Sequence, residues 1–353
     1  MSKLSRHNYI DVLRVVSSIA VIAIHVIIYY IPAFKVHSIP WTVLMSGKAI
    51  TQFAVPVFFM VSGASIFSST REETYANFIK RRLTKIAIPF FVYSIIYYLF
   101  YVFVKAEYQL GVYEFLKRFF GKSIQGHFWY LYALIPLYFF YPVIKKCVNS
   151  LSKRGLLTLI LAFFAIDSVI PLVNQLLALF CNFKFGVYSF GRMGVYLNYT
   201  LIGYYIHTHI PATKKNGIIA AVTGTASVGA MILLSYLTST KNFDQQWVNI
   251  LLAFVVIQAA SVMLLTKCIY QNKELKPFTQ KTLSTLGMLS FSAYLVHMLV
   301  LRTVQLEINQ KYIKSIESIE AAGIILTIFA GCVIICYLWA FIVSKIPVIK
   351  KIL

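Results

Sequence analysis

Residues 14–25 read RVVSSIAVIAIH and lie inside an apolar run that extends over residues 9–31. A helix of about 20 apolar residues is long enough to cross the hydrocarbon core of a bilayer. The run therefore predicts a membrane-spanning helix, although it carries Arg14 near one end and His25 eleven residues later. Ionisable groups are costly in lipid, so these two indicate a face that is turned toward other helices or toward water.

The composition extends this prediction to the whole chain of 353 residues. Hydrophobic residues make up 59% and charged residues only 12%, with a mean hydropathy of +0.75. Such a chain has too little polar surface to cover a soluble core. We expect an all-α integral membrane protein, a bundle of about ten transmembrane helices in a single polytopic domain over 1–353, with no fused soluble domain. The predicted spans are 9–31, 42–67, 84–104, 128–144, 156–180, 193–210, 217–237, 247–268, 283–301 and 321–344.

The net charge of +22 does not indicate a nucleic-acid partner, because the basic residues form short clusters between apolar runs. Lys and Arg concentrate in cytoplasmic loops of membrane proteins. A topology with both termini cytoplasmic places most of the 33 basic residues on the inner side. The first run lacks a cleavage pattern and is expected to be retained. The five cysteines match no disulfide or zinc spacing, and no metal site is predicted.

A polar stripe follows the first predicted span. At about 100° per residue, Arg14 and His25 lie within about 20° of each other and about 16 Å apart along the axis. Asp11 and Ser18 share this face. In one interpretation, Asp11 and Arg14 form an interfacial ion pair and His25 hydrogen-bonds a neighbouring helix. In the other, the stripe lines a reaction path.

Three histidines are expected at one depth near the outer surface. His127 begins a span that runs inward, and His297 lies near the outer end of a span that runs outward. Together with His25 they place three imidazoles at one level. A neutral imidazole can take a proton from a hydroxyl at working pH. This convergence predicts a site for acid–base chemistry.

The stretch FIKRRLTKIAIP at residues 78–89 places a basic cluster at the cytoplasmic end of the third predicted span. The cluster contains Lys80, Arg81, Arg82 and Lys85. One interpretation is plain topology, or binding of anionic lipid head groups. The other is an anionic ligand with several phosphates, since guanidinium forks match phosphate oxygens.

Five stretches resemble, in this order, the acyltransferase family 3 membrane proteins, bacterial O-acyltransferases that modify surface sugars. They are DVLRVVSSIAVIAIHV (11–26), AVPVFFMVSGASIF (54–67), KRRLTKIAIP (80–89), GHFWYLYALIPLYFFYPVI (126–144) and LSFSAYLVHMLVL (289–301). The resemblance covers nearly the whole chain. It departs from the family at Lys85, where a second arginine is common. Charge is retained there, but two-pronged hydrogen bonding is not.

The resemblance implies a donor and an acceptor on opposite sides of a bacterial plasma membrane. The donor would be acetyl-CoA, or another short acyl-CoA, used as a substrate and not as a permanently bound cofactor. The acceptor would be a hydroxyl of a cell-surface or lipid-linked glycan at the outer face. The resemblance also implies that Arg14 and His25 are functional residues.

We expect His25 to act as general base and His127, Tyr294 or His297 to stabilise charge on the thioester oxygen. The CoA phosphates would rest on Arg81, Arg82 and Lys85, with Arg14 part way along the pantetheine arm. Direct transfer and an acyl-histidine intermediate both remain open.

Other interpretations compete with this one. A transporter of a lipid-linked sugar or small solute would use the polar stripe as a permeation path, and a scaffold subunit would have no chemistry of its own. The aromatic residues at 128–132 form either an interfacial belt or a sugar-stacking platform. Asp167 is an unexplained carboxylate within a predicted span. The protein contacts membrane lipid, and homo-oligomerisation is left open.

Overall fold

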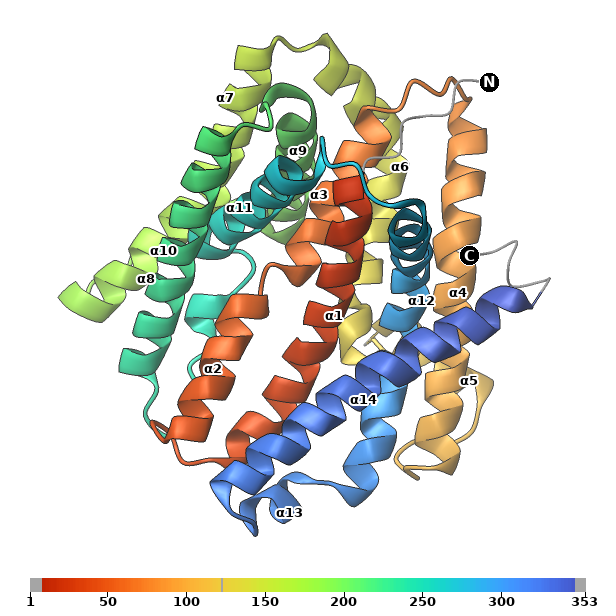
Figure 1. The fold of residues 1–353 in the computed structure, drawn as a ribbon, viewed down its shortest axis with the longest axis vertical. Coiled ribbons are helices and arrows are strands. Elements are labelled where there is room, and N and C mark those ends of the chain that lie inside the picture. Colours follow the sequence, from red (N-terminus) through yellow and green to blue (C-terminus); the bar gives the residue numbers. More distant parts are fainter. Residues whose placement is uncertain (1–7, 122, 347–353) are drawn as a thin grey trace.

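The computed structural model describes residues 8–121 and 123–346, and within these ranges the chain is helical without β-strands (Figure 1). The helices are α1 Asn8–Tyr30, α2 Ile39–Thr51, α3 Ala54–Phe67, α4 Tyr75–Phe103, α5 Val112–Gly121, α6 Trp129–Ser150, α7 Lys153–Phe164, α8 Ile170–Cys181, α9 Gly191–His209, α10 Lys214–Thr238, α11 Ala253–Tyr270, α12 Pro277–Glu307, α13 Gln310–Lys314 and α14 Ser318–Lys345. Short 3₁₀ turns occupy Ile31–Ala33, Gly126–Phe128 and Gln246–Val248. Some of the basic residues assigned to the cytoplasmic side, Lys3, Arg6, Lys350 and Lys351, lie outside the described residues.

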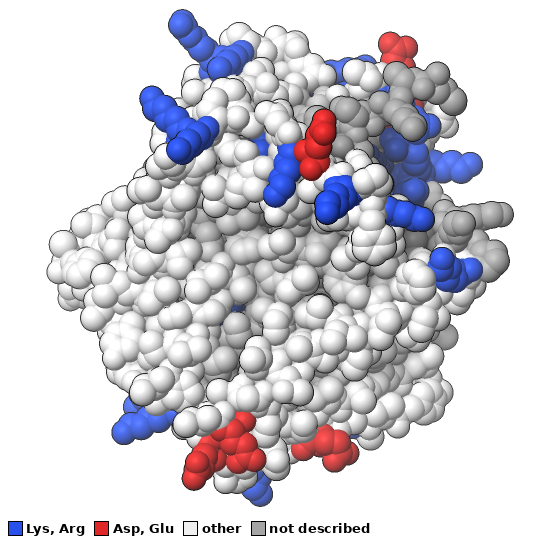
Figure 2. Space-filling view, viewed as in Figure 1, with Lys and Arg blue, Asp and Glu red and all other residues white. Residues whose placement is uncertain are grey.

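Nine helical segments of the described chain are long and apolar enough to cross a membrane. They are Asn8–Ala33, Ile39–Phe67, Tyr75–Phe103, Gly126–Ser150, Lys153–Cys181, Lys214–Thr238, Ala253–Tyr270, Pro277–Glu307 and Ser318–Lys345. Each coincides with one predicted span. Figure 2 shows Lys and Arg gathered at one end of the visible face and a broad band almost without charge across the middle. The fold is that of a multi-pass membrane protein.

The predicted span at 193–210 is the helix α9, which is not among these nine segments. Its composition is less apolar because much of it is buried against other helices, α3 above all. Gly203 does not break it. A Cβ at Gly203 would lie 2.1 Å from the Met60 carbonyl oxygen, and one at Gly63 would lie 2.0 Å from that of Thr200. Both glycines therefore allow the backbones of α3 and α9 to meet.

Two predicted spans are interrupted where polar side chains occur. The second divides into α2 and α3 at Gln52 and Phe53. The fifth contains a π-helical turn at Ala165–Val169, between α7 and α8, and this turn carries Asp167. Such interruptions inside helices occur often at functional or structurally special positions.

Helix α1 is the central element of the bundle. It packs against α12, α3, α2, α11 and α14, and Figure 1 shows it near the middle of the molecule. A Cβ at Gly287 of α12 would lie 3.0 Å from the Asp11 Oδ1 atom, so α12 approaches α1 closely where the polar stripe begins. Within the stripe, Asp11 and Ser18 are buried in the protein, whereas Arg14 and His25 are half-buried.

Candidate active site

The three histidines expected at one depth form a compact cluster. His25 comes from α1, His127 from the 3₁₀ turn before α6, and His297 from α12. The ring centroids are 6.2 Å apart for His25 and His127, 5.0 Å for His25 and His297, and 4.7 Å for His127 and His297. His127 and His297 are only 3% and 1% exposed. The structure brings these residues together, while their catalytic roles stay predictions.

Hydrogen bonds around the cluster set the orientation of two rings. The His297 Nδ1 atom donates to the backbone carbonyl oxygen of Tyr294, and the Tyr294 hydroxyl donates to that of His127 at 2.6 Å. A carbonyl oxygen only accepts, so Nδ1 of His297 carries the proton and Nε2 of the neutral ring holds a lone pair. That Nε2, and both ring nitrogens of His127, lack a well-aligned hydrogen-bond partner among the described residues.

These bonds bear on two of the roles expected from the sequence, which stay predictions. Neutral His297 presents a proton acceptor at Nε2, which suits a base or a proton relay better than a donor to an oxyanion. The hydroxyl proton of Tyr294 is already donated to the His127 carbonyl, so Tyr294 positions His127. No group of three or more His, Cys, Asp or Glu in the described ranges is arranged to hold a metal ion.

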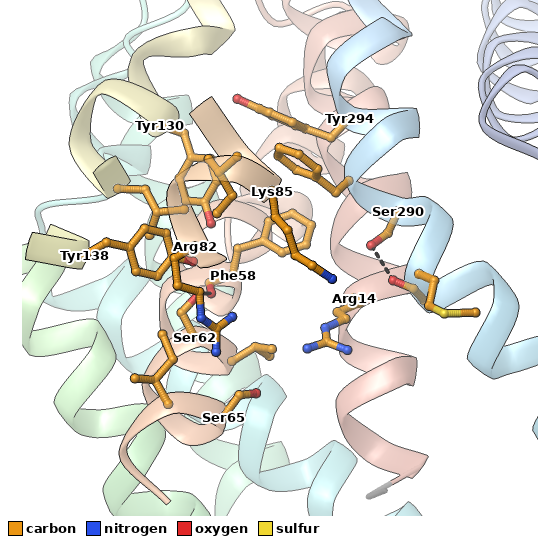
Figure 3. Close-up of a pocket in the computed structure, with 17 residues that line it drawn as sticks. Arg14, Phe58, Ser62, Ser65, Arg82, Lys85, Tyr130, Tyr138, Ser290 and Tyr294 are labelled. Carbon is orange, nitrogen blue, oxygen red and sulfur yellow. Dashed lines mark hydrogen bonds between the residues drawn. The ribbon is translucent and has the colours of Figure 1, made fainter. Parts of the chain in front are cut away.

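A cavity of about 340 Å³, here called the donor cavity, extends from part of the basic cluster to Tyr294, which is next to the histidines. Arg14 of α1 and Arg82 and Lys85 of α4 line it, and Figure 3 shows all three pointing into the same space. Tyr130 and Tyr294 line it as well. The Tyr294 ring lies 5.3 Å from the His127 ring, so one wall of the cavity contacts the histidine cluster.

The first residues of the polar stripe form the ion pair that one interpretation expected. Arg14 Nη1 lies 3.3 Å from Asp11 Oδ1, and Asp11 is 3% exposed. Because Arg14 also lines the donor cavity, the pairing does not exclude a role toward a ligand. A buried carboxylate can hold the guanidinium in position at the cavity wall.

Arg81 is not part of the donor cavity, contrary to its expected grouping with Arg82 and Lys85. Its Nε donates to Glu73 Oε2 at 3.1 Å, and its Nη2 donates to Glu73 Oε1. Burial alone would raise the pKa of the Glu73 carboxyl, but the hydrogen bond from Arg81 and the charges of Arg81, Arg71 and Arg82 hold this pKa below its ordinary value. The pair is therefore ionised near neutral pH.

An adjoining cavity of about 290 Å³ contains Arg81, and Arg82 lines both cavities. Arg71, Lys145 and Lys146 also line it, and the sequence did not indicate that they meet the α4 cluster. Arg71 lies in the loop that leads into α4, whereas Lys145 and Lys146 lie near the end of α6 and are brought here by the packing of α6 against α4. The anionic ligand expected at α4 would meet a larger cationic surface than α4 alone provides.

Two further cations near the histidines were missed. Lys48 on α2 is 5% exposed and lines a cavity together with Trp129, two residues after His127, and Arg302 follows His297 by five residues on α12. Both are single basic residues in or next to long apolar runs. A charged residue is costly in a membrane, so these two positions could have been singled out from the sequence on the same ground as Asp167.

Asp167 has a structural explanation. Its Oδ1 accepts a hydrogen bond from the Phe190 backbone N–H at 2.7 Å, directly before α9 begins. A carboxylate at this position satisfies a free N–H group and complements the helix dipole. A Cβ at Gly194 would lie 2.3 Å from Asp167 Oδ2, so this contact also needs a glycine.

The aromatic residues at 128–132 do not form one surface belt. Phe128 is 0% exposed and Tyr130 is 7% exposed. Tyr132 is half-buried, and its hydroxyl donates to the Phe119 carbonyl. Trp129 is half-buried and lines a separate cavity. Most of this cluster therefore packs inside the bundle.

The chain matches the family model of acyltransferase family 3, described as an acyltransferase domain, over residues 7–342. It therefore belongs to this family and is a multi-pass membrane acyltransferase. No curated protein and no solved structure matches the chain significantly. Family membership supports acyl chemistry over the transporter and scaffold interpretations.

Proposed function

We propose that the protein transfers an acyl group, most simply acetyl, from cytoplasmic acyl-CoA to a hydroxyl of a cell-surface or lipid-linked glycan. In this proposal the acceptor lies at the outer face of a bacterial plasma membrane, and both termini of the protein lie in the cytoplasm. The observation that carries this proposal is the donor cavity, which joins Arg14, Arg82 and Lys85 to the tyrosine beside the histidine cluster.

The shape of the donor cavity suits CoA, which has a polyphosphate head and a narrow pantetheine arm. Arg82 and Lys85 supply charge at one side of the cavity. Arginine can bind phosphate through two parallel hydrogen bonds, whereas lysine acts as a point charge. The adjoining cavity with Arg71, Arg81 and Lys145 extends the positive surface for the head. The arm would then follow the stripe from Arg14 toward His25, a rise of about 16 Å.

In the proposed reaction, a histidine removes the proton from the acceptor hydroxyl while the hydroxyl oxygen forms a bond to the thioester carbonyl carbon. The carbon–sulfur bond breaks, and CoA leaves as a thiolate that takes up a proton. A general base of this kind contributes about 10²–10⁴ in rate. We assign the base to His25, with His297 next to it as a proton relay because its Nε2 has no partner among the described residues.

The test uses purified full-length protein and acetyl-CoA labelled in the acetyl group. We expect slow release of free CoA by the wild type, and loss of most of it in His25→Ala with CoA binding retained. His209→Ala is the matched control. His209 is the last residue of α9, and its ring contacts Tyr205 and no histidine of the cluster. Label trapped on the wild-type protein would identify an acyl-enzyme. Equal turnover by wild type and His25→Ala would contradict the proposed role of His25.

If the wild type neither binds nor turns over acetyl-CoA, the measurement is repeated with succinyl-CoA. Failure with both donors would contradict the proposed function.

A further inference from the structure

A second cavity of about 390 Å³ lies apart from the donor cavity and shares no lining residue with it. It is lined by Lys48 of α2, Gln52 of the α2–α3 break, Trp129 of α6, Arg192 and Tyr196 of α9, Gln245, and residues 248–251. We call it the polar cavity.

The polar cavity and the donor cavity are lined by adjacent residues of α6. Trp129 lines the polar cavity while the next residue, Tyr130, lines the donor cavity. The buried Phe59 ring stacks on Tyr196 at 5.0 Å and meets Tyr130 at 4.9 Å, so it separates the two. Trp129 follows His127 by two residues in the chain, so the polar cavity also lies near the histidine cluster. Two substrates could therefore approach the histidines from two cavities.

The charges in the polar cavity suit an anion. Lys48 and Arg192 are cationic, and no Asp or Glu is among the residues that line it. The Lys48 ammonium is buried, and within the described ranges it makes no ion pair and no side-chain hydrogen bond. A buried charge is costly unless it is paired. A ligand anion would supply the partner that Lys48 lacks, and the exposed Arg192 could contact the same anion.

The remaining lining residues suit a carbohydrate. The Trp129 and Tyr196 rings lie 5.6 Å apart and tilted by 34°, and they provide apolar faces for the C–H side of a sugar ring. The amides of Gln52, Gln245 and Asn249 offer donors and acceptors to hydroxyls. The buried Gln52 Oε1 atom has no hydrogen-bond partner among the described residues, so it is an acceptor that a sugar hydroxyl can satisfy.

We propose that the polar cavity binds the acceptor and that the acceptor is an acidic sugar, which carries a carboxylate or a phosphate. Its anion would lie on Lys48 and Arg192, its ring on Trp129, and a hydroxyl would point toward the histidine cluster. The acceptor role rests on the proposed function, whereas the binding of an acidic sugar rests on the cavity alone.

Sugar binding is measured on the purified full-length protein without any acyl donor, through the quenching of tryptophan fluorescence. The probes are methyl β-D-glucuronide, glucose 6-phosphate and the neutral methyl β-D-glucoside. We expect at least one acidic probe to bind about tenfold or more tightly than the neutral one, because it makes charge-assisted hydrogen bonds. The better of the two acidic probes identifies the anion. Trp129→Phe should remove most of the quenching.

Arg192→Gln tests the charge preference, and its exposed position makes loss of the fold unexpected. The variant should bind the acidic probes with nearly the same affinity as the neutral glucoside. Arg154→Gln, an exposed arginine at the start of α7, is the matched control and should keep the preference. Equal binding of charged and neutral probes by the wild type would overturn the proposal. So would a full charge preference in Arg192→Gln.

The two proposals fail separately. Selective binding of an acidic sugar by a protein that turns over no acyl-CoA would overturn the proposed function and the acceptor role, but not the sugar site. Turnover of acyl-CoA that depends on His25, together with no preference for acidic sugars, would overturn only the sugar site.

Discussion

The His297 and His127 rings lie 4.7 Å apart between centroids, and Tyr294, one turn before His297 on α12, donates a hydrogen bond to the His127 backbone. Helix α12 thus both supplies one imidazole and positions another. A sequence analysis can place the two histidines at one depth, but only this packing shows that one helix controls both.

The lone pair on His297 Nε2 predicts a role in proton movement. His297→Ala should lower kcat for acyl transfer by about 10²-fold, at the low end for general acid–base catalysis, because His25 remains. KM for acyl-CoA should change little, since His297 does not line the donor cavity. Steady-state kinetics with varied donor concentration checks this, with His209→Ala as control. A raised KM with unchanged kcat would contradict it.

Tyr294→Phe removes one hydrogen bond to the His127 carbonyl while leaving the ring in place. The loss should cost about 1 kcal/mol of unfolding free energy and should also lower kcat, because His127 loses its positioning contact. Tyr132→Phe loses a similar hydrogen bond, to the Phe119 carbonyl, outside the histidine cluster. It should show a comparable shift in thermal stability with unchanged kcat. Equal kcat for both variants would argue for a purely structural role of Tyr294.

Arg82 is predicted to bind the phosphate head of the donor. Arg82→Gln should raise KM for acetyl-CoA by about tenfold or more, as expected for the loss of a hydrogen bond to a charged group. KM for S-acetylpantetheine, which lacks the phosphate head, should stay nearly the same in the variant and the wild type. Arg118→Gln is the control, because Arg118 pairs with Glu114 on α5 and lines neither the donor cavity nor the adjoining cavity that contains Arg81. An equal effect on both donors would show that Arg82 acts elsewhere.

The Glu73–Arg81 pair predicts a pH-dependent contribution to stability. Because the pKa of Glu73 is lowered in the folded protein, its contribution is present above the ordinary carboxyl pKa and is lost as the pH falls through the folded pKa. Glu73→Gln should therefore be less stable than the wild type by roughly 0.2–1 kcal/mol at neutral pH. Thermal unfolding at pH 7 and at about pH 3.5 should show this difference shrink in acid, because the carboxyl of the unfolded chain is then largely protonated and folding must release that proton. A difference that persists unchanged in acid would exclude the ion pair as its cause.

The contact between α3 and α9 predicts a strong effect at Gly203. A Cβ there would overlap the Met60 carbonyl, so Gly203→Ala should destabilise the protein by about 1–3 kcal/mol or more. Gly229→Ala in α10 is the matched control, since no atom lies within 4 Å of the added Cβ. It should be neutral or stabilise by up to about 1 kcal/mol. Thermal unfolding in detergent distinguishes the two, and equal Tm values would contradict the close packing.

From the sequence alone, the membrane class, nine of the spans and the shared face of Arg14 and His25 could be predicted. These features depend on the local length and period of apolar residues, which a membrane constrains strongly. The predicted span at 193–210 is not among the nine apolar segments, because a helix packed inside the bundle need not be apolar on every side. Its tyrosines and glycines contact other helices, and each such contact depends on two segments that are far apart in the sequence.

Only the tertiary structure decided how separate helices share their polar groups. It turned Arg81 toward Glu73, brought Lys48 and Trp129 to one cavity, and used Asp167 at the start of α9. It also placed Trp129 and Tyr130 in different cavities although they are adjacent in the chain. Helix periodicity determines the face on which a residue lies, but the partner on that face depends on which helices pack together, and that is set by contacts between distant segments.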